Sequence, residues 1–353
     1  MVINKEDIKK ILEIAANAPS GSNSQPWKFK VKDNQIYVIA LPEKDHPILN
    51  YRNRGTWIAH GALIENIVIA SSSFGYEAKV KIFPDLSQPN LTAVIELALG
   101  LPKSDSLFSV IPLRATNRKQ YEDRLLSDVQ KQEFLKSASS FKEIEIKFTE
   151  DKEQRRLIGE ALSINEVVTL ENEKLHKLFF EEIVWSRPEE SIKKSGLYLK
   201  TMELEPPQQA VLKLLRRWRV MKLFNHLKFA GIIAKDNAKR YASGAGMGII
   251  IVNDRDEDFL LAGRAMERLW LKATQMRLSF HLITGTMFFW QGIQNDTANI
   301  FSKEHIEIIN NAYNKITEVF NINRGVAALA FRVGLSKEPS ALSSKKPPEI
   351  IWI

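Results

Sequence analysis

Apolar residues recur at helical spacing at the start of the chain, at positions 8, 11, 12, 14, 15 and 18. This pattern predicts an amphipathic helix over residues 5–18. The helix should end at Pro19-Ser20-Gly21, because this turn chemistry interrupts the helical pattern. Two short strands are predicted next, over 27–31 and 35–40, joined by a hairpin turn at Asp33-Asn34.

The same periodicities continue through most of the chain and predict repeated helix-and-sheet units. The expected helices cover residues 56–74, 127–138, 151–180, 256–276 and 303–320, and the expected strands cover 77–83, 91–99, 144–149, 247–252 and 325–333, with a short apolar run at 280–283.

Two of the long predicted helices resemble each other. The stretch 61–70 can be laid over 263–272, and each begins with a glycine followed four positions later by a glutamate, Glu65 or Glu267. A chance match of two helices remains one explanation. The shared order of helices and strands around them favours an old duplication.

Composition narrows the class of protein. The 353 residues are 44% hydrophobic, enough for one large or two modest domains, and no apolar run reaches the roughly 18 to 20 residues of a membrane helix. The first residues lack the charged-then-apolar layout of a signal peptide, so we expect a cytoplasmic protein. The absence of cysteine excludes disulfides and thiolate sites, and the scattered histidines predict no metal site.

The net charge of +8 is concentrated in the basic stretch 213–222. Nucleic acid, an anionic lipid surface and a solvated helix face are three ways to explain such a run. Helical spacing of Leu212, Leu215, Val220, Leu223 and Leu227 favours one amphipathic helix over 212–228. We therefore predict neither nucleic-acid binding nor a membrane span.

Two segments carry candidate binding chemistry. The loop 18–27, Ala-Pro-Ser-Gly-Ser-Asn-Ser-Gln-Pro-Trp, combines donor side chains with exposed turn amides and suits an anion-and-amide cradle. An ordinary helix-to-strand connection is the alternative. Arg114 and Arg118 lie on a turn that could clamp a phosphate, or else they are surface charges.

These segments resemble the nitroreductase family, in which A-P-S-x-x-N-x-Q-P-W marks a loop that reaches FMN. The string Arg114-Ala-Thr116-Asn-Arg118 is similar to the family motif R-x-[ST]-x-R, and the end of the chain is similar to R-x-G…S-x-R-R with lysines at 345 and 346. The resemblance implies FMN contacts from the loop (Pro19, Ser20, Asn23, Gln25), the arginine motif (Arg114, Thr116, Arg118), the flavin edge (Thr284, Gly285) and the closing segment (Arg332, Lys345, Lys346).

The order of these motifs is reversed relative to ordinary family members, in which the arginine motif comes first and two subunits share each flavin. A fused pair of halves, 1–110 and 111–353, explains this order and resembles the Acg-type subgroup, as does the string 52–55. The expected fold is α+β, with a mainly antiparallel sheet packed by helices in each half. Because the loop motif does not recur after residue 126, we expect one FMN per chain, in a monomer or homodimer.

Residues 183–245 match the family least and are expected to form a helical insert that closes over the flavin as a lid. The glycines at 244, 246 and 248 lack dinucleotide-loop spacing and precede a strand, so we interpret them as a hinge. His281 is the one histidine expected beside the flavin edge. Trp185, Tyr198 and Trp218 either face the cavity or pack elsewhere.

The resemblance implies an FMN-dependent oxidoreductase that takes hydride from NADH or NADPH through flavin N5. It would reduce a small electron-poor or conjugated substrate, with no catalytic side chain and no metal, because the cofactor carries the chemistry. The alternative is a non-catalytic protein that sequesters FMN beneath a closed lid. A basic interaction module acting on nucleic acid or membrane is a third, weaker alternative.

Overall fold

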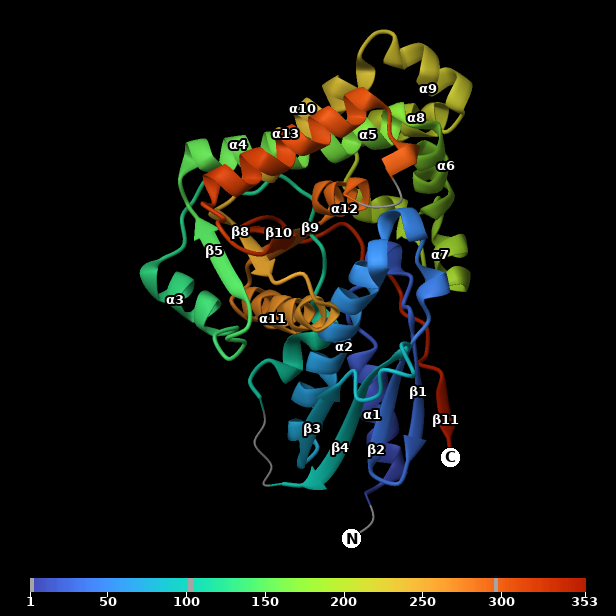
Figure 1. Cartoon of the computed structure of the whole chain (residues 1–353), viewed down its shortest axis with the longest axis vertical. Coiled ribbons are helices and arrows are strands. Elements are labelled where there is room, and N and C mark those ends of the chain that lie inside the picture. Colours follow the sequence, from blue (N-terminus) through green and yellow to red (C-terminus); the bar gives the residue numbers. More distant parts are fainter. Residues whose placement is uncertain (1–2, 101–104, 295–297) are drawn as a thin grey trace.

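Two β-sheets and the two long helices between them form the centre of the molecule (Figure 1). The computed structural model describes residues 3–100, 105–294 and 298–353. Helices α2 (Arg54–Ser73) and α11 (Asp256–Gln275) pack against each other, and each also lies against its own half's sheet. The fold is α+β, with two halves that each contain a mainly antiparallel sheet.

The first sheet comes almost wholly from the first hundred residues and has the strand order β11-β1-β2-β4-β3. Alternation in β1 buries Trp27, Phe29 and Val31 on one face, against the core shared with α1 and α2. All neighbouring strands are antiparallel except β11, which pairs parallel with β1. The first sheet consists of β1 (Trp27–Lys32), β2 (Gln35–Ala40), β3 (Tyr76–Ile82), β4 (Leu91–Leu99) and β11 (Ile350–Trp352), and α1 (Lys5–Ala15) packs against it.

The second sheet is antiparallel throughout, in the order β5-β8-β10-β9, and is covered by helices on both faces. Ile250 and Val252 of β8 face the core around α11, whereas Met247, Ile249 and Ile251 face α4 and α13. The elements are β5 (Glu145–Thr149), β8 (Gly246–Val252), β9 (Ser279–Ile283), β10 (Val326–Gly334), α3 (Asp128–Lys136), α4 (Lys152–Leu162), α12 (Gly285–Ile293) and α13 (Lys303–Val319).

Helices α2 and α11 cross at the two glycines that the sequence comparison aligned. A Cβ on Gly61 would lie 2.0 Å from the Leu260 carbonyl oxygen, and a Cβ on Gly263 would lie 2.0 Å from that of Ile58. Gly61 therefore contacts the residue three positions before Gly263, and Gly263 contacts the residue three positions before Gly61. Two segments related by a twofold axis make such reciprocal contacts. The crossing supports the duplication.

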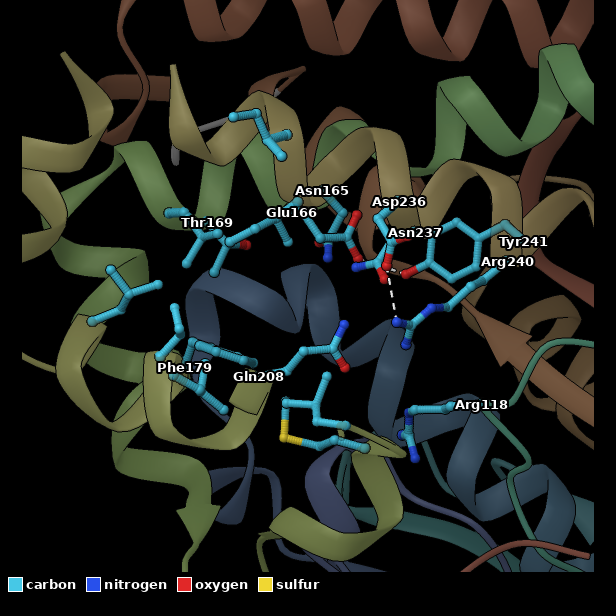
Figure 2. Close-up of a pocket in the computed structure, with 18 of the residues that line it drawn as sticks. Arg118, Asn165, Glu166, Thr169, Phe179, Gln208, Asp236, Asn237, Arg240 and Tyr241 are labelled. Atoms are coloured by element: carbon cyan, nitrogen blue, oxygen red, sulfur yellow. Dashed lines mark hydrogen bonds and ion pairs between the residues drawn. The ribbon is translucent and has the colours of Figure 1, made fainter. Parts of the chain in front are cut away.

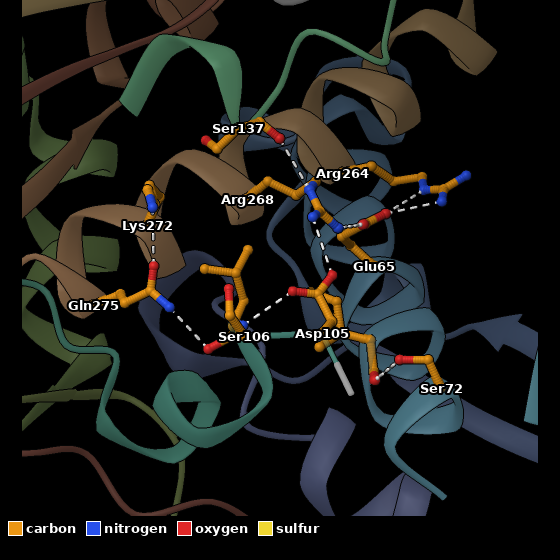
Figure 3. A network of polar contacts seen from close by, with 11 residues as sticks. Glu65, Ser72, Asp105, Ser106, Ser137, Arg264, Arg268, Lys272 and Gln275 are labelled. Atoms are coloured by element: carbon orange, nitrogen blue, oxygen red, sulfur yellow. Dashed lines mark hydrogen bonds and ion pairs between the residues drawn. The ribbon is translucent and has the colours of Figure 1, made fainter. Parts of the chain in front are cut away.

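Ion pairs join the same two helices beside this crossing (Figure 3). The Glu65 carboxylate accepts hydrogen bonds from Arg264 and Arg268, each at 2.8 Å, and Arg268 also reaches Asp105 at 3.1 Å. Two guanidinium groups share one buried carboxylate, so the charge of Glu65 is compensated where the halves meet.

A helical insert covers one end of the second half. It is packed around its own apolar cluster, which includes Leu170, Phe180, Leu215 and Met221. Its elements and the two helices that lead into it are α5 (Ile164–Glu171), α6 (Glu173–Glu182), β6 (Ile183–Val184), α7 (Arg187–Lys193), β7 (Leu197–Tyr198), α8 (Pro206–Leu215), α9 (Trp218–Asn225) and α10 (Phe229–Ala242). In the described residues no helix has both the length and the apolar character to span a membrane.

Two predicted helices are wrong as single elements. The stretch 151–180 is broken at Ser163 and at Asn172, whose side chain accepts hydrogen bonds from the amides of the next helix and caps it. The basic stretch 212–228 is broken at 216–217. As a result Leu215 is buried, but Leu223 and Leu227 are 66% and 74% exposed and do not join its apolar face.

Two of the three glycines of the predicted hinge do not form one, whereas Gly244 lies before the strand with a φ of 115°. Gly246 and Gly248 lie within β8, which is hydrogen-bonded on both sides, to β5 and β10. A Cβ on either residue would lie 2.2 Å from an aromatic ring, that of Phe148 or Phe331. These glycines make room for core rings rather than for movement.

Candidate functional site

A cavity of about 490 Å³ lies where the two halves, the insert and the C-terminal segment meet, and we call it the interhalf cavity. The first half contributes the loop after α1 and the segment 44–59, and the second half contributes residues from the arginine motif, α11, β9 and α12. Its lining includes Pro19, Ser20, Ser22, Ser24, Lys44, Asp45, Asn50, Ile58, Thr116, Arg118, Glu182, Ser195, Gly196, Met266, Trp270, Leu282, Thr284, Phe288 and Lys346.

The loop after α1 is tightly curled. Ser22, Asn23 and Gln25 adopt positive φ angles of 43°, 56° and 53°, a conformation that short polar residues tolerate better than branched ones. The Ser20 hydroxyl accepts a hydrogen bond from the Gln25 amide at 2.9 Å and closes the curl. Three serine side chains of this loop consequently line the cavity.

Asn23 and Gln25 connect the loop to distant segments. The Asn23 amide donates to the Ser344 carbonyl at 3.0 Å, and its oxygen accepts from Lys345 Nζ at 2.8 Å. Gln25 donates to the Lys194 carbonyl at 2.7 Å and accepts from the Lys346 amide at 2.8 Å. Among the described residues, these two side chains are not part of the cavity lining. They instead join the loop to the segments around residues 194 and 344–346.

The arginine motif likewise has some residues that line the cavity and one that lies behind its wall. Arg118 and Thr116 line the interhalf cavity, and Arg118 donates to the Thr201 carbonyl at 3.0 Å. Arg114 lies behind the wall, where its guanidinium stacks on Trp270, donates to the Asn17 carbonyl at 2.9 Å and lies 3.6 Å from the Glu267 carboxylate. Burial lowers the pKa of Arg118, yet the guanidinium remains cationic because its ordinary pKa is so high.

Positive charge dominates one part of the cavity wall. Lys44 and Lys346 lie there close to each other, and burial together with Lys346 lowers the pKa of Lys44, while Arg118 adds a third cation to the lining. Two carboxyl groups oppose them, but burial raises the pKa of both Asp45 and Glu182. The balance favours an anionic ligand. Lys345 lies behind the wall, and burial together with Arg114 lowers its pKa to about 7.

The remaining wall is apolar and includes Ile58, Met266, Trp270, Leu282 and Phe288. Beside it, Thr284 lies immediately before α12 and lines the cavity. A Cβ on Gly285 would lie 2.0 Å from Asn165 Oδ1, so this glycine makes room for a side chain of α5. A wall of this kind can accept a flat ring, with polar groups at its edge.

Two residues expected near the flavin lie elsewhere. Arg332 is fully buried and donates to the carbonyls of Arg240 and Lys119, to Ser243 and, at 3.3 Å, to His281 Nδ1. Both Arg332 and His281 line a second cavity, which shares only Arg118 with the first among their lining residues. Burial, with Arg332 and Arg118 nearby, lowers the pKa of His281 well below its usual value, so its imidazole is neutral.

Sequence patterns missed several lining residues, including Lys44, Asp45, Asn50, Glu182 and Ser195. The string 52–55 that resembles the Acg-type subgroup lies beside Asn50 and was the one available signal for that segment. Glu182 and Ser195 come from the end of α6 and from the insert, and only the tertiary fold brings them to the loop.

Comparison with known proteins agrees with these motifs. A family model described as "Nitroreductase family" matches residues 1–39. A "Putative NADH dehydrogenase/NAD(P)H nitroreductase" of Archaeoglobus fulgidus is 31% identical over 130 residues, which cover 31% of this chain and 73% of that protein. A "Putative NAD(P)H nitroreductase acg" of Mycobacterium tuberculosis is 25% identical over 97 residues, 28% of this chain and 29% of that protein.

A longer similarity reaches beyond the first half. An "Uncharacterized protein MT1398" of Mycobacterium tuberculosis is 22% identical over 286 residues, which cover 80% of this chain but only 39% of that protein. The chain thus spans well under two thirds of the length of this relative. The family model and the Archaeoglobus fulgidus relative together show that the chain belongs to the nitroreductase family.

Proposed function

We propose that the interhalf cavity binds one FMN and that the chain is an FMN-dependent oxidoreductase. The observation that carries this proposal is the convergence of three distant segments on one cavity. Ser20 comes from the family's loop motif, Arg118 from its arginine motif and Lys346 from its closing segment. We further propose 1–110 and 111–353 as the two halves whose junction forms the site.

The lining of the interhalf cavity suits FMN in its volume, its apolar surface and its charge. A cavity of about 490 Å³ falls within the roughly 300 to 1,000 Å³ of small-molecule sites. Trp270 and Met266 offer an apolar wall for the ring, and Arg118 and Lys346 offer positive charge for the phosphate. Because Lys346 lacks the fork of an arginine, Arg118 is assigned the dominant phosphate contact.

The other predicted site residues support this arrangement in different ways. Pro19, Thr116 and Thr284 line the cavity and would contact FMN there. Asn23, Gln25, Arg114 and Lys345 fix the loop and the closing segment from behind. Gly285 makes room for Asn165 and Arg332 lines the second cavity, so neither belongs to the lining of the interhalf cavity.

FMN, when bound, would accept hydride from NADH or NADPH and deliver it to a small electron-poor or conjugated substrate. The chain's own part is to hold the cofactor, hydrogen-bond its polar edge and shield it from water. No acid or base is required from the lining for this role. Asp45 and Glu182 accept hydrogen bonds from Thr56 and Ser22, which position them within the wall.

A second candidate function, sequestration of FMN without turnover, is favoured by one observation. Glu182, Ser195 and Gly196 line the interhalf cavity, and the Lys194 carbonyl is held by Gln25 of the loop motif. The insert and the segment leading into it therefore form part of the wall and can restrict access to a bound cofactor.

Anaerobic mixing with NADH or NADPH distinguishes the two functions. For an oxidoreductase we expect bleaching of the flavin absorbance band on a timescale of turnover with at least one donor. A stoichiometric flavin that neither donor bleaches would contradict the enzyme and support sequestration. Free FMN under the same conditions is the control for direct reduction in solution.

A further inference from the structure

The second cavity is larger than the first and lies under the insert (Figure 2). Its volume is about 610 Å³, and most of its wall is apolar, with contributions from α5, α6, α8 and α10. The apolar members include Leu170, Phe179, Met202, Leu212, Phe229 and Ile233. Such a wall suits a hydrocarbon chain or ring system.

One end of this cavity is polar and carries excess positive charge. Arg118 and Arg332 lie there, and in the described part of the chain neither has an ion-pair partner. Arg240, a third cation, is paired with Asp236 at 2.9 Å. Glu166 accepts a hydrogen bond from the Tyr241 hydroxyl at 2.5 Å, and burial raises the pKa of this carboxyl to about 7.

The charges at this end do not cancel, because Glu203, the carboxylate whose charge acts on Arg118, is itself paired with Lys119 at 3.6 Å. Asp236 is neutralised by Arg240, and Glu166 is partly protonated near neutral pH. The guanidinium of Arg118 uses one donor on the Thr201 carbonyl and faces both cavities. A cation in a low-dielectric pocket attracts an anionic group more strongly than one at the surface.

The opposite end of the cavity reaches the surface. Val211 of α8 and Ile232 of α10 both line the cavity and are 40% and 61% exposed. Two further leucines, Leu214 and Leu227, are exposed close by in the chain. Exposed apolar side chains and cationic side chains therefore lie in the lining of one cavity.

We propose that the second cavity binds an amphipathic anion, an apolar chain or ring that ends in one carboxylate. The apolar part would lie between α8 and α10, and the carboxylate would meet Arg118. This site is separate from the proposed FMN site, although Arg118 contributes to both walls. The proposal does not depend on FMN binding or on turnover.

Calorimetric titration with dodecanoate tests the site, with dodecanol and dodecyltrimethylammonium as neutral and cationic probes. The protein is used as purified, and its flavin content is measured before and after. We expect one dodecanoate per chain, bound at least about tenfold more tightly than either other probe, because a charge-assisted contact is worth about 1.4 kcal/mol or more. Equal affinity for the three probes would overturn the proposal.

Substitutions in the apolar wall test whether dodecanoate binds in the second cavity. Leu212→Glu places a charge in the apolar wall and should weaken dodecanoate binding by about tenfold. Its control is Leu223→Glu on α9, an exposed leucine outside the lining, which should bind as the native chain does. If Leu212→Glu does not fold, Ile233→Trp narrows the cavity without a charge and should also weaken binding.

Flavin release distinguishes the two cavities. Binding that leaves the flavin content unchanged supports a separate site, whereas one-for-one displacement of flavin by dodecanoate that is equal in the native chain and in Leu212→Glu would place the ligand in the interhalf cavity and contradict the proposal, because Arg118 lines both cavities but Leu212 lines only the second. Equal loss of affinity in Leu212→Glu and Leu223→Glu would also contradict it, because only the first residue lines the cavity.

Discussion

Arg118 is the side chain on which both proposed sites depend. It follows the Thr116 turn, lines both cavities and leaves most of its donors free of carboxylates in the described part of the chain. The resemblance of its motif to that of the nitroreductase family predicted an FMN contact for it, and the structure places it in the lining of the interhalf cavity. Arg332, predicted by the same reasoning, instead satisfies four acceptors within the second half, a role that spacing does not reveal.

Glu267 makes a prediction about the pH dependence of stability. Burial raises the pKa of its carboxyl from 4.5 to about 7, and Arg114 offsets only part of this. The folded chain therefore keeps a proton that the unfolded chain has lost, so the contribution to stability is full below about pH 4.5 and is lost as the pH rises to 7. Between these pH values the free energy of unfolding should decrease. We expect this decrease to be smaller in Glu267→Gln by on the order of 1 to 3 kcal/mol.

Denaturant unfolding at several pH values between 5 and 7 measures this effect. Glu318→Gln, at an exposed carboxyl of α13, is the matched control and should follow the native curve. Burial also raises the pKa of Glu166 to about 7, so part of the fall should persist in the Glu267 variant. Parallel curves for native chain and Glu267→Gln would refute the role assigned to Glu267.

At the scale of the elements, the crossing of α2 and α11 fixes how closely the halves approach. Because a Cβ on Gly61 or Gly263 would meet a backbone oxygen at 2.0 Å, the clash cannot be relieved by rotating a side chain. The helices would have to separate, and the lining residues Ile58 and Met266 lie on these same helices. The geometry of the interhalf cavity thus depends on two glycines.

We expect Gly263→Ala to lower the free energy of unfolding by about 3 kcal/mol and to weaken FMN binding as the halves move apart. Gly231→Ala in α10 is the control, because its Cβ would have nothing within 4 Å. That variant should leave stability unchanged or raise it by up to about 1 kcal/mol. Thermal unfolding and flavin content measure both effects, and equal stability of the two variants would contradict this account.

Elements with a sustained hydrophobic period could be predicted, and the exceptions have physical causes. The helix of 256–276 and the strands of the second sheet agree closely with the structure because one or both faces are buried along their whole length. Asn172 interrupts a helical pattern by capping a new helix, which periodicity does not detect. Strand β11 is three residues long, too short to show a period.

At the scale of the whole molecule, the motif order predicted the fused pair, but not how the chain closes on itself. Strand β11 returns to the first sheet, and the segment before it brings Lys345 and Lys346 to the loop motif. The loop and Arg118 could be predicted from the sequence because their motifs are local. Glu182 and Ser195 could not, because nothing near them in the chain indicates which loop they will face.

FMN titration of the flavin-free chain, followed by flavin fluorescence, tests the central claim most directly. We predict one FMN per chain, and we predict that Arg118→Gln weakens its affinity by about tenfold to a hundredfold because the phosphate loses its charge-assisted contact. Arg219→Gln removes an exposed arginine of α9 that lies outside the cavity lining and should bind FMN like the native chain. Native-like affinity in Arg118→Gln, or no stoichiometric binding of FMN to the native chain, would contradict the claim.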